Sequence, residues 1–178
     1  MAEIKERTEG VENQENTESM NVNYKRIDHI AIAVENLESA MAYYKKTLGF
    51  SVAECRVTEG KKTSMVSAVM SNGGVTVVLV QGLQADSQVS RFIQKYGPGV
   101  QHVAFEVDDL EQTKAILDKR NTEFTTSIIK GAGVRQIFTK RDPDSQVMFE
   151  FIERDDKYGF EDSNVNNLFL QLEASESY

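Results

Sequence analysis

Residues 29–50 read HIAIAVENLESAMAYYKKTLGF, and residues 102–124 read HVAFEVDDLEQTKAILDKRNTEF. The two stretches match in order and chemistry with one inserted residue, and each begins with one of the two histidines of this 178-residue chain. Self-similarity of this kind indicates an internal duplication. The pattern therefore predicts an α+β fold built from two tandem βαβββ units, at about residues 25–83 and 99–154.

The predicted elements follow from apolar periodicity and from the residues that start and stop helices. In the first unit we predict strands at about residues 24–34, 51–57, 62–70 and 75–80, and a helix at 37–48 between Asn36 and Gly49. Asn72-Gly73 marks a hairpin turn between the last two strands. After a helical connector at 84–96, the second unit has predicted strands at 100–107, 124–129, 134–140 and 147–152 and a helix at 110–119.

Two segments flank the repeat. Residues 1–23 are acidic and carry almost no apolar side chain, so they predict a disordered tail before a domain at 24–155. Residues 156–178 predict a C-terminal segment whose helix, at about 164–173, caps the domain.

Composition disfavours several classes of function. The net charge of -8 disfavours nucleic acid and anionic membranes as partners, because like charges repel. Cys55 is the sole cysteine, which indicates a reducing, intracellular setting, and it lacks the neighbouring base that a nucleophilic thiol needs. There is no apolar run long enough to span a bilayer and no signal-peptide pattern, so we expect a cytoplasmic protein.

The two histidines and Glu150 form a candidate metal site. Both imidazoles stand at the same register of the repeat, and Ala31 and Ala104 follow two positions later, so small side chains line the histidine face. Glu150 lies on an apolar strand face, where an unpaired carboxylate is costly and a cation offsets the cost. Two imidazoles and one carboxylate form the facial triad of non-haem Fe(II) oxygenases, so we predict one Fe(II) per chain, bound by His29, His102 and Glu150.

Two alternatives concern the ligand set. Glu150 has another interpretation as one half of an ion pair, and the cations considered for it are Arg135, Lys140 and Arg141. In the first unit Val78 corresponds to Glu150, which excludes a carboxylate from each unit unless another residue substitutes. The candidates for that substitution are Glu54, Glu59 and Gln81. Three protein ligands are the favoured number.

The duplicated unit with a histidine at the start of each half resembles the vicinal oxygen chelate superfamily over about residues 25–153. This resemblance implies that the two units form one half-barrel domain. The second unit is similar to the catalytic half of 4-hydroxyphenylpyruvate dioxygenase, which here would stand alone. The segments that carry this similarity are 99–104 (GVQHVA), 136–140 (QIFTK), 149–154 (FEFIER), 159–160 (GF), Asn164 and 168–169 (LF).

The resemblance implies an Fe(II)-dependent dioxygenase that uses O2 to decarboxylate and oxygenate a 2-oxo acid. It also implies substrate contacts from Ser67, Gln88, Gln101, Gln136, Phe138, Phe160 and Asn164. Strand alternation places Gln136 and Phe138 on one face, but it places Gln101 on the face opposite His102. Met148 and Val165 stand where the family carries aromatic residues, which predicts a differently shaped or more aliphatic substrate than 4-hydroxyphenylpyruvate.

Other functions stay open on the sequence. An extradiol catechol dioxygenase uses the same three ligands but generally adds a further histidine, which this chain lacks. A glyoxalase or epimerase is disfavoured by Val78. A metal-free binding or resistance protein, in which His29 and His102 only line a pocket, is the alternative from a different class. A homodimer is compatible with the pairing of units in small members of this superfamily.

Overall fold

The computed structural model describes residues 21–131, 133–155 and 170–171. The first unit contains β1 (Tyr24–Ala33), α1 (Leu37–Leu48), β2 (Ser51–Glu59), β3 (Ser64–Asn72) and β4 (Val75–Gly82). After α2 (Gln88–Tyr96), the second unit contains β5 (Gly99–Val107), α3 (Leu110–Lys119), β6 (Ile129–Gly131), β7 (Val134–Phe138) and β8 (Met148–Arg154). The predicted order of two βαβββ units joined by a helical connector is confirmed.

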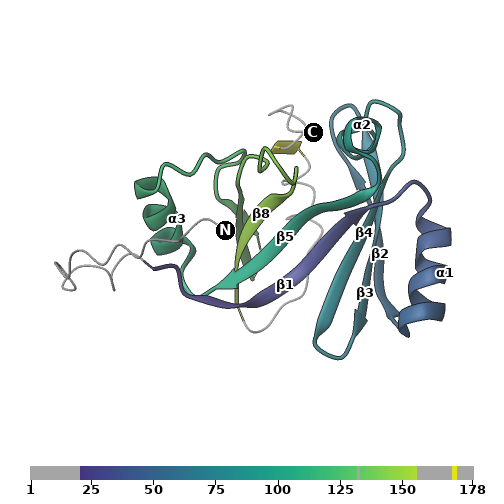
Figure 1. Ribbon diagram of the computed structural model, residues 1–178, viewed down its shortest axis with the longest axis horizontal. Coiled ribbons are helices and arrows are strands. Elements are labelled where there is room, and N and C mark those ends of the chain that lie inside the picture. Colours follow the sequence, from purple (N-terminus) through teal and green to yellow (C-terminus); the bar gives the residue numbers. More distant parts are fainter. Residues whose placement is uncertain (1–20, 132, 156–169, 172–178) are drawn as a thin grey trace, which may run out of the picture.

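The strands form one curled eight-stranded sheet in the order β2-β3-β4-β1-β5-β8-β7-β6. Each unit places its first strand beside its last in parallel, as β1 with β4 and β5 with β8, while β1 and β5 pair antiparallel. The units therefore meet through their first strands. Figure 1 shows the resulting half-barrel as two lobes on either side of the long β1–β5 pair.

A helix covers the outer side of each lobe, and the capping residues explain its limits (Figure 1). Asn36 accepts a hydrogen bond from the Ser39 amide at the start of α1, and Gly49 ends the helix at φ 67°. Asp109 caps α3 in the same way. Beneath α1 lies an apolar cluster centred on Met70 and Leu79, and a second cluster lies beneath α3. Each lobe thus has its own core.

The structure differs from the predicted elements at two places. The predicted strand at 124–129 is wrong: Phe124 makes a single bridge to Thr139, and β6 begins only at Ile129. In this segment the Thr126 hydroxyl accepts the hydrogen bond of the Phe138 amide, so a side chain replaces part of the strand ladder. Val22 is buried in the core of the second lobe, so the ordered chain begins before Tyr24.

Most of the predicted tail and of the C-terminal segment lies outside the described residues. Leu170 and Gln171 are helical, and the Gln171 side-chain oxygen accepts hydrogen bonds from the amide and hydroxyl of Ser127 at 3.2 and 3.1 Å. Within the described part of the chain, each helix is too short or too polar to cross a membrane.

Candidate metal centre

The three predicted ligands come from three neighbouring strands at the middle of the sheet. His29 lies on β1, His102 on β5 and Glu150 on β8, and all three are buried. In the strand register His29 lies opposite Ala104, and Ala104 lies opposite Glu150. Ala31 lies opposite His102. Both alanines are fully buried, so the small side chains leave room for the larger ones, as the repeat predicted.

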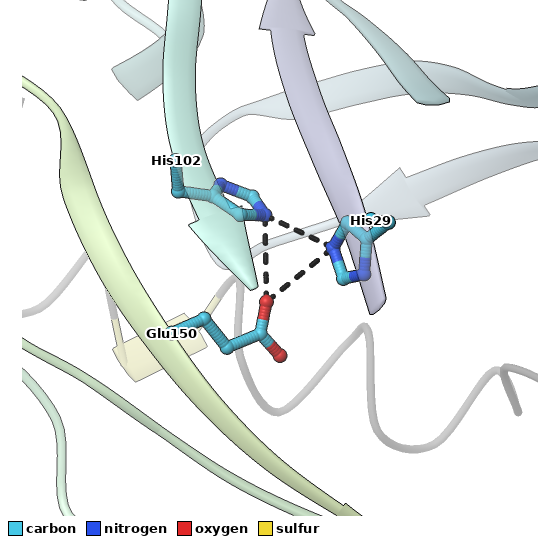
Figure 2. A group of neighbouring side chains, drawn as sticks. All are labelled: His29, His102 and Glu150. Carbon is cyan, nitrogen blue, oxygen red and sulfur yellow. Dashed lines mark hydrogen bonds and ion pairs between the residues drawn. The ribbon is translucent and has the colours of Figure 1, made fainter. Parts of the chain in front are cut away.

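The donor atoms converge on one point (Figure 2). The two histidine Nε2 atoms are 3.3 Å apart, and they lie 3.4 Å (His29) and 3.5 Å (His102) from Oε2 of Glu150. Ligand atoms bound to one ion at about 2.1 Å lie roughly 3 to 3.5 Å from one another. The spacing therefore fits a single metal ion.

The tautomers of the two histidines follow from their other ring nitrogens. Nδ1 of His29 donates to Oδ1 of Asp28 at 2.8 Å, and Nδ1 of His102 donates to Oε1 of Gln101 at 2.6 Å. Both Nε2 atoms then present lone pairs to the same point as the carboxylate. Oε1 of Glu150 is buried and has no hydrogen-bond partner among the described residues. A buried cluster of acceptors needs a cation, so these residues fit a metal ion.

Burial also shapes the protonation of the ligands. It raises the pKa of Glu150 to about 7, with Asp28 adding to the rise against the opposing effect of His29. Burial lowers the pKa of His102 well below its ordinary value, with help from nearby His29 and Arg141. His102 is therefore neutral, as a ligand must be, whereas Glu150 exchanges its proton near neutral pH.

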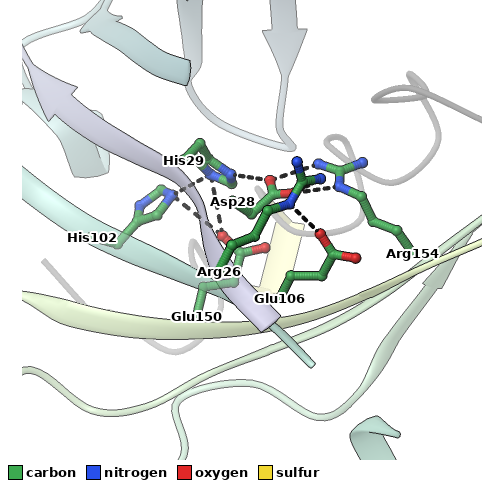
Figure 3. A network of polar contacts seen from close by, with 7 residues as sticks. All are labelled: Arg26, Asp28, His29, His102, Glu106, Glu150 and Arg154. Carbon is green, nitrogen blue, oxygen red and sulfur yellow. Dashed lines mark hydrogen bonds and ion pairs between the residues drawn. The ribbon is translucent and has the colours of Figure 1, made fainter. Parts of the chain in front are cut away.

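Behind His29 lies a network of charged side chains (Figure 3). Arg154 donates to both carboxylate oxygens of Asp28, at 2.6 and 2.9 Å. Burial alone would raise the pKa of Asp28, but the hydrogen bonds from Arg154 and His29 outweigh it and hold that pKa well below its usual range. Asp28 is therefore a buried anion fixed between an arginine and an imidazole.

The ion-pair interpretation of Glu150 is wrong. The three cations considered for it have other partners: Arg135 pairs with Glu153 at 2.5 Å, Lys140 pairs with Glu123 at 2.9 Å, and Arg141 donates to the backbone oxygens of Gln101 and Gln146. Within the described residues, Glu150 forms ion-pair contacts with the two histidines.

The first unit offers no fourth ligand among the described residues. Val78 lies opposite Ala31 just as Glu150 lies opposite Ala104, so the two positions correspond. The three candidate substitutes are used elsewhere or point to solvent: Glu54 pairs with Arg56, Gln81 accepts from the Leu37 amide at 2.7 Å, and Glu59 is exposed. The only group of three or more His, Cys, Asp or Glu residues with metal-ligand spacing in the described chain is His29, His102 and Glu150.

The predicted substrate residues that the structure describes are all buried: Ser67, Gln88, Gln101, Gln136 and Phe138. Phe138 lies opposite Glu150 in the register, and its ring packs edge-on against His102 at 5.3 Å between centroids. The side-chain oxygen of Gln88 is buried without a hydrogen-bond partner in the described chain. Phe160 and Asn164 lie outside the described residues.

Two features escaped the sequence analysis. Strand alternation placed Gln101 away from His102, but a β-bulge brings the two side chains together. A second β-bulge places Asp28 beside His29, and Arg154 donates a hydrogen bond to Asp28. The repeat offered a clue, because Asp28 and Gln101 each precede a histidine.

The model of the glyoxalase/bleomycin resistance protein/dioxygenase superfamily matches residues 28–139. The chain therefore belongs to this superfamily, which confirms the predicted resemblance.

The individual relatives include proteins named for two different chemistries. The chain is 30% identical to 4-hydroxyphenylpyruvate dioxygenase of Coccidioides posadasii, over 70% of this chain and 32% of that protein. It is 32% identical to human mitochondrial methylmalonyl-CoA epimerase, over 61% of each. A triple mutant of 4-hydroxymandelate synthase from Streptomyces coelicolor shares the fold, with TM-score 0.77, 24% identity and coverage of 84% of this chain and 54% of that one. The chain thus spans about a third of the dioxygenase and about half of the synthase.

Proposed function

We propose that this chain is a non-haem Fe(II)-dependent dioxygenase that acts on a 2-oxo acid. The observation that carries the proposal is the convergence of two Nε2 lone pairs and one carboxylate, with Val78 where a fourth ligand would stand. Three protein ligands leave coordination positions for a bidentate substrate and O2. A closed four-ligand site would remove that capacity.

Each part of the chain has a separate role in this proposal. His29, His102 and Glu150 would hold Fe(II), and the bound ion would supply the activation of O2 that side chains cannot provide. Phe138 lies beside Glu150 and His102 and would exclude water from that side of a bound ion. Gln88, whose side chain is buried, would contact the substrate.

We infer that the substrate is an aryl or alkyl pyruvate other than 4-hydroxyphenylpyruvate. Met148 lies opposite His102 in the register, is fully buried and packs with Phe138. A thioether adapts to irregular apolar shapes and offers no ring for stacking. The wall next to the metal site therefore favours a flexible or aliphatic side chain.

The test is anaerobic reconstitution with Fe(II), followed by parallel measurement of O2 uptake and CO2 release over a panel of 2-oxo acids. We expect consumption of O2 to match release of CO2 for at least one substrate. The matched control is Glu150→Gln, which keeps the shape of the site and removes the anionic ligand. Bound iron without turnover of any 2-oxo acid would reject the proposal.

A metal-dependent epimerase is the second candidate, because of the similarity to human methylmalonyl-CoA epimerase. It requires proton exchange at the carbon next to a thioester carbonyl and needs no O2. Incubation of the metal-loaded protein with methylmalonyl-CoA in deuterated water, without O2, separates the two candidates. Incorporation of deuterium would favour the epimerase, and an apo protein that ignores added Fe(II), Co(II) and Mn(II) would favour a metal-free binding protein.

A further inference from the structure

Two β-bulges stand at equivalent places in the central strands. Along β1, Ile27 and His29 face consecutive residues of β5, so Asp28 is the extra residue. Along β5, Val100 and His102 face consecutive residues of β1, so Gln101 is the extra residue. A bulge re-aims the extra side chain. As a result, each histidine is held at Nδ1 by the residue that precedes it.

Asp28 and Gln101 differ in charge although they occupy equivalent positions of the repeat. Asp28 is a carboxylate that receives two hydrogen bonds from Arg154, and its side chain is only 5% exposed. Gln101 is a neutral amide, and Arg141 donates to its backbone oxygen rather than to its side chain. The duplicated histidines therefore face unlike partners.

We infer that Asp28, fixed by Arg154, is a positioning residue that makes His29 the stronger of the two imidazole ligands. The inference rests on the metal site of the proposed function. An anionic acceptor at Nδ1–H fixes the tautomer, orients the ring and raises the electron density at Nε2 more than a neutral amide does. His29 thereby differs from His102 in the property that governs metal affinity.

Glu106 provides an internal comparison. Its carboxylate is also buried, and it pairs with Lys25. It also pairs with Arg26, as drawn in Figure 3. Arg26 approaches Asp28 only at 3.8 Å, and Glu106 pairs with Lys25 and Arg26. Glu106→Gln therefore removes a buried charge from the same network without removing the support of the imidazole.

The experiment is a titration of the full chain with Co(II), whose visible absorption reports both affinity and ligand geometry. We expect Asp28→Asn to weaken Co(II) binding by about 10- to 100-fold. Glu106→Gln should bind as wild type does. Arg154→Gln breaks the same ion pair as Asp28→Asn but leaves the carboxylate on His29, so it should lower thermal stability comparably and affinity less.

The outcomes separate the inference from the proposed function. Equal Co(II) affinity in wild type and Asp28→Asn would overturn the inference alone, as would equal losses in Asp28→Asn and Arg154→Gln, which would mean that Asp28 acts through the fold. Tight Co(II) binding by the wild type without turnover of any 2-oxo acid would reject the proposed function and leave the inference standing. A wild type that binds no Co(II) would overturn both.

Discussion

At the scale of single residues, the candidate site depends on residue type as well as on position in the repeat. Glu150 and Val78 occupy corresponding positions, yet one is a carboxylate facing two imidazoles and the other is apolar. Without a metal, the carboxylate is a liability, because burial favours its protonated form.

Because burial disfavours the ionised carboxylate of Glu150, the stability of the metal-free protein should depend on pH. Between the unfolded pKa of a glutamate, about 4.3, and the folded pKa of Glu150, about 7, the folded state keeps a proton that the unfolded state has lost. The Glu150 contribution to the free energy of unfolding therefore falls as pH rises through this window, by about 4 kcal/mol in all.

His102 acts in the opposite sense, because its lowered pKa makes stability rise with pH below the ordinary pKa of histidine. The measurement is thus the difference in urea unfolding between Glu150→Gln and wild type, both metal-free, from pH 5 to pH 8. We expect the variant to gain stability relative to wild type as pH rises. A constant difference would contradict the buried, proton-binding Glu150.

Substitution of Val78 tests directly whether the proposed metal site leaves coordination positions open. Val78→Glu should supply a fourth ligand at the position that corresponds to Glu150, and so retain or tighten metal binding while O2-dependent turnover is lost. Val78→Met fills similar space without an oxygen ligand and should keep metal binding at three ligands. Unchanged turnover in Val78→Glu would mean that the two positions do not share a site.

The sequence was sufficient to predict that the three candidate ligands lie together, but not to predict the side chains that hold them. The repeat and the strand alternation placed His29, His102 and Glu150 together, because register alone decides which side chains share a face. Alternation assumes an uninterrupted strand, so it put Gln101 on the wrong face and passed over Asp28. The ion pair with Arg154 joins residues 126 positions apart and has no local pattern in the sequence.

At the scale of elements too, features that depend on local sequence were predicted, and features that depend on distant contacts were not. The helices were predicted at 37–48 and at about 110–119, which agrees with the structure, since their capping residues act locally. The segment at 124–129 was not, because its pairing depends on side-chain contacts with β7.

The connection from β4 to α2 has its own steric requirement. A Cβ on Gly82 would lie well inside contact distance of the Ser87 and Ser90 hydroxyls and 2.9 Å from the Ser90 amide. Ser87 caps α2, which carries Gln88 and Phe92. Gly82→Ala should therefore destabilise the fold by about 1 to 3 kcal/mol in denaturant unfolding. Gly74→Ala is the control, because its Cβ would meet no atom within 4 Å, and an equal loss there would contradict the steric explanation.

At the scale of the whole molecule, the candidate site takes its residues from both units, so binding of a metal ion there would be coupled to folding. A ligand present at 100 times its Kd stabilises the folded state by about 2.7 kcal/mol. Fe(II) or Co(II) should thus raise the Tm by several degrees, measured by thermal unfolding with and without a chelator. His102→Ala should abolish the increase, and a metal-dependent rise that survives this change would place the metal elsewhere.

The antiparallel pairing of β1 and β5 would give a bound ion a mechanical role as well as a chemical one. His29 and His102 stand on the two strands through which the duplicated halves meet, and Glu150 stands on the next strand. A bound ion would link the two halves across the β1–β5 pair. Separating the halves would then require breaking metal–ligand bonds as well as the hydrogen bonds between the strands. Backbone amides of β1 and β5 should then exchange with deuterated solvent far more slowly in the loaded protein, while those of the outer strand β2 should scarcely respond.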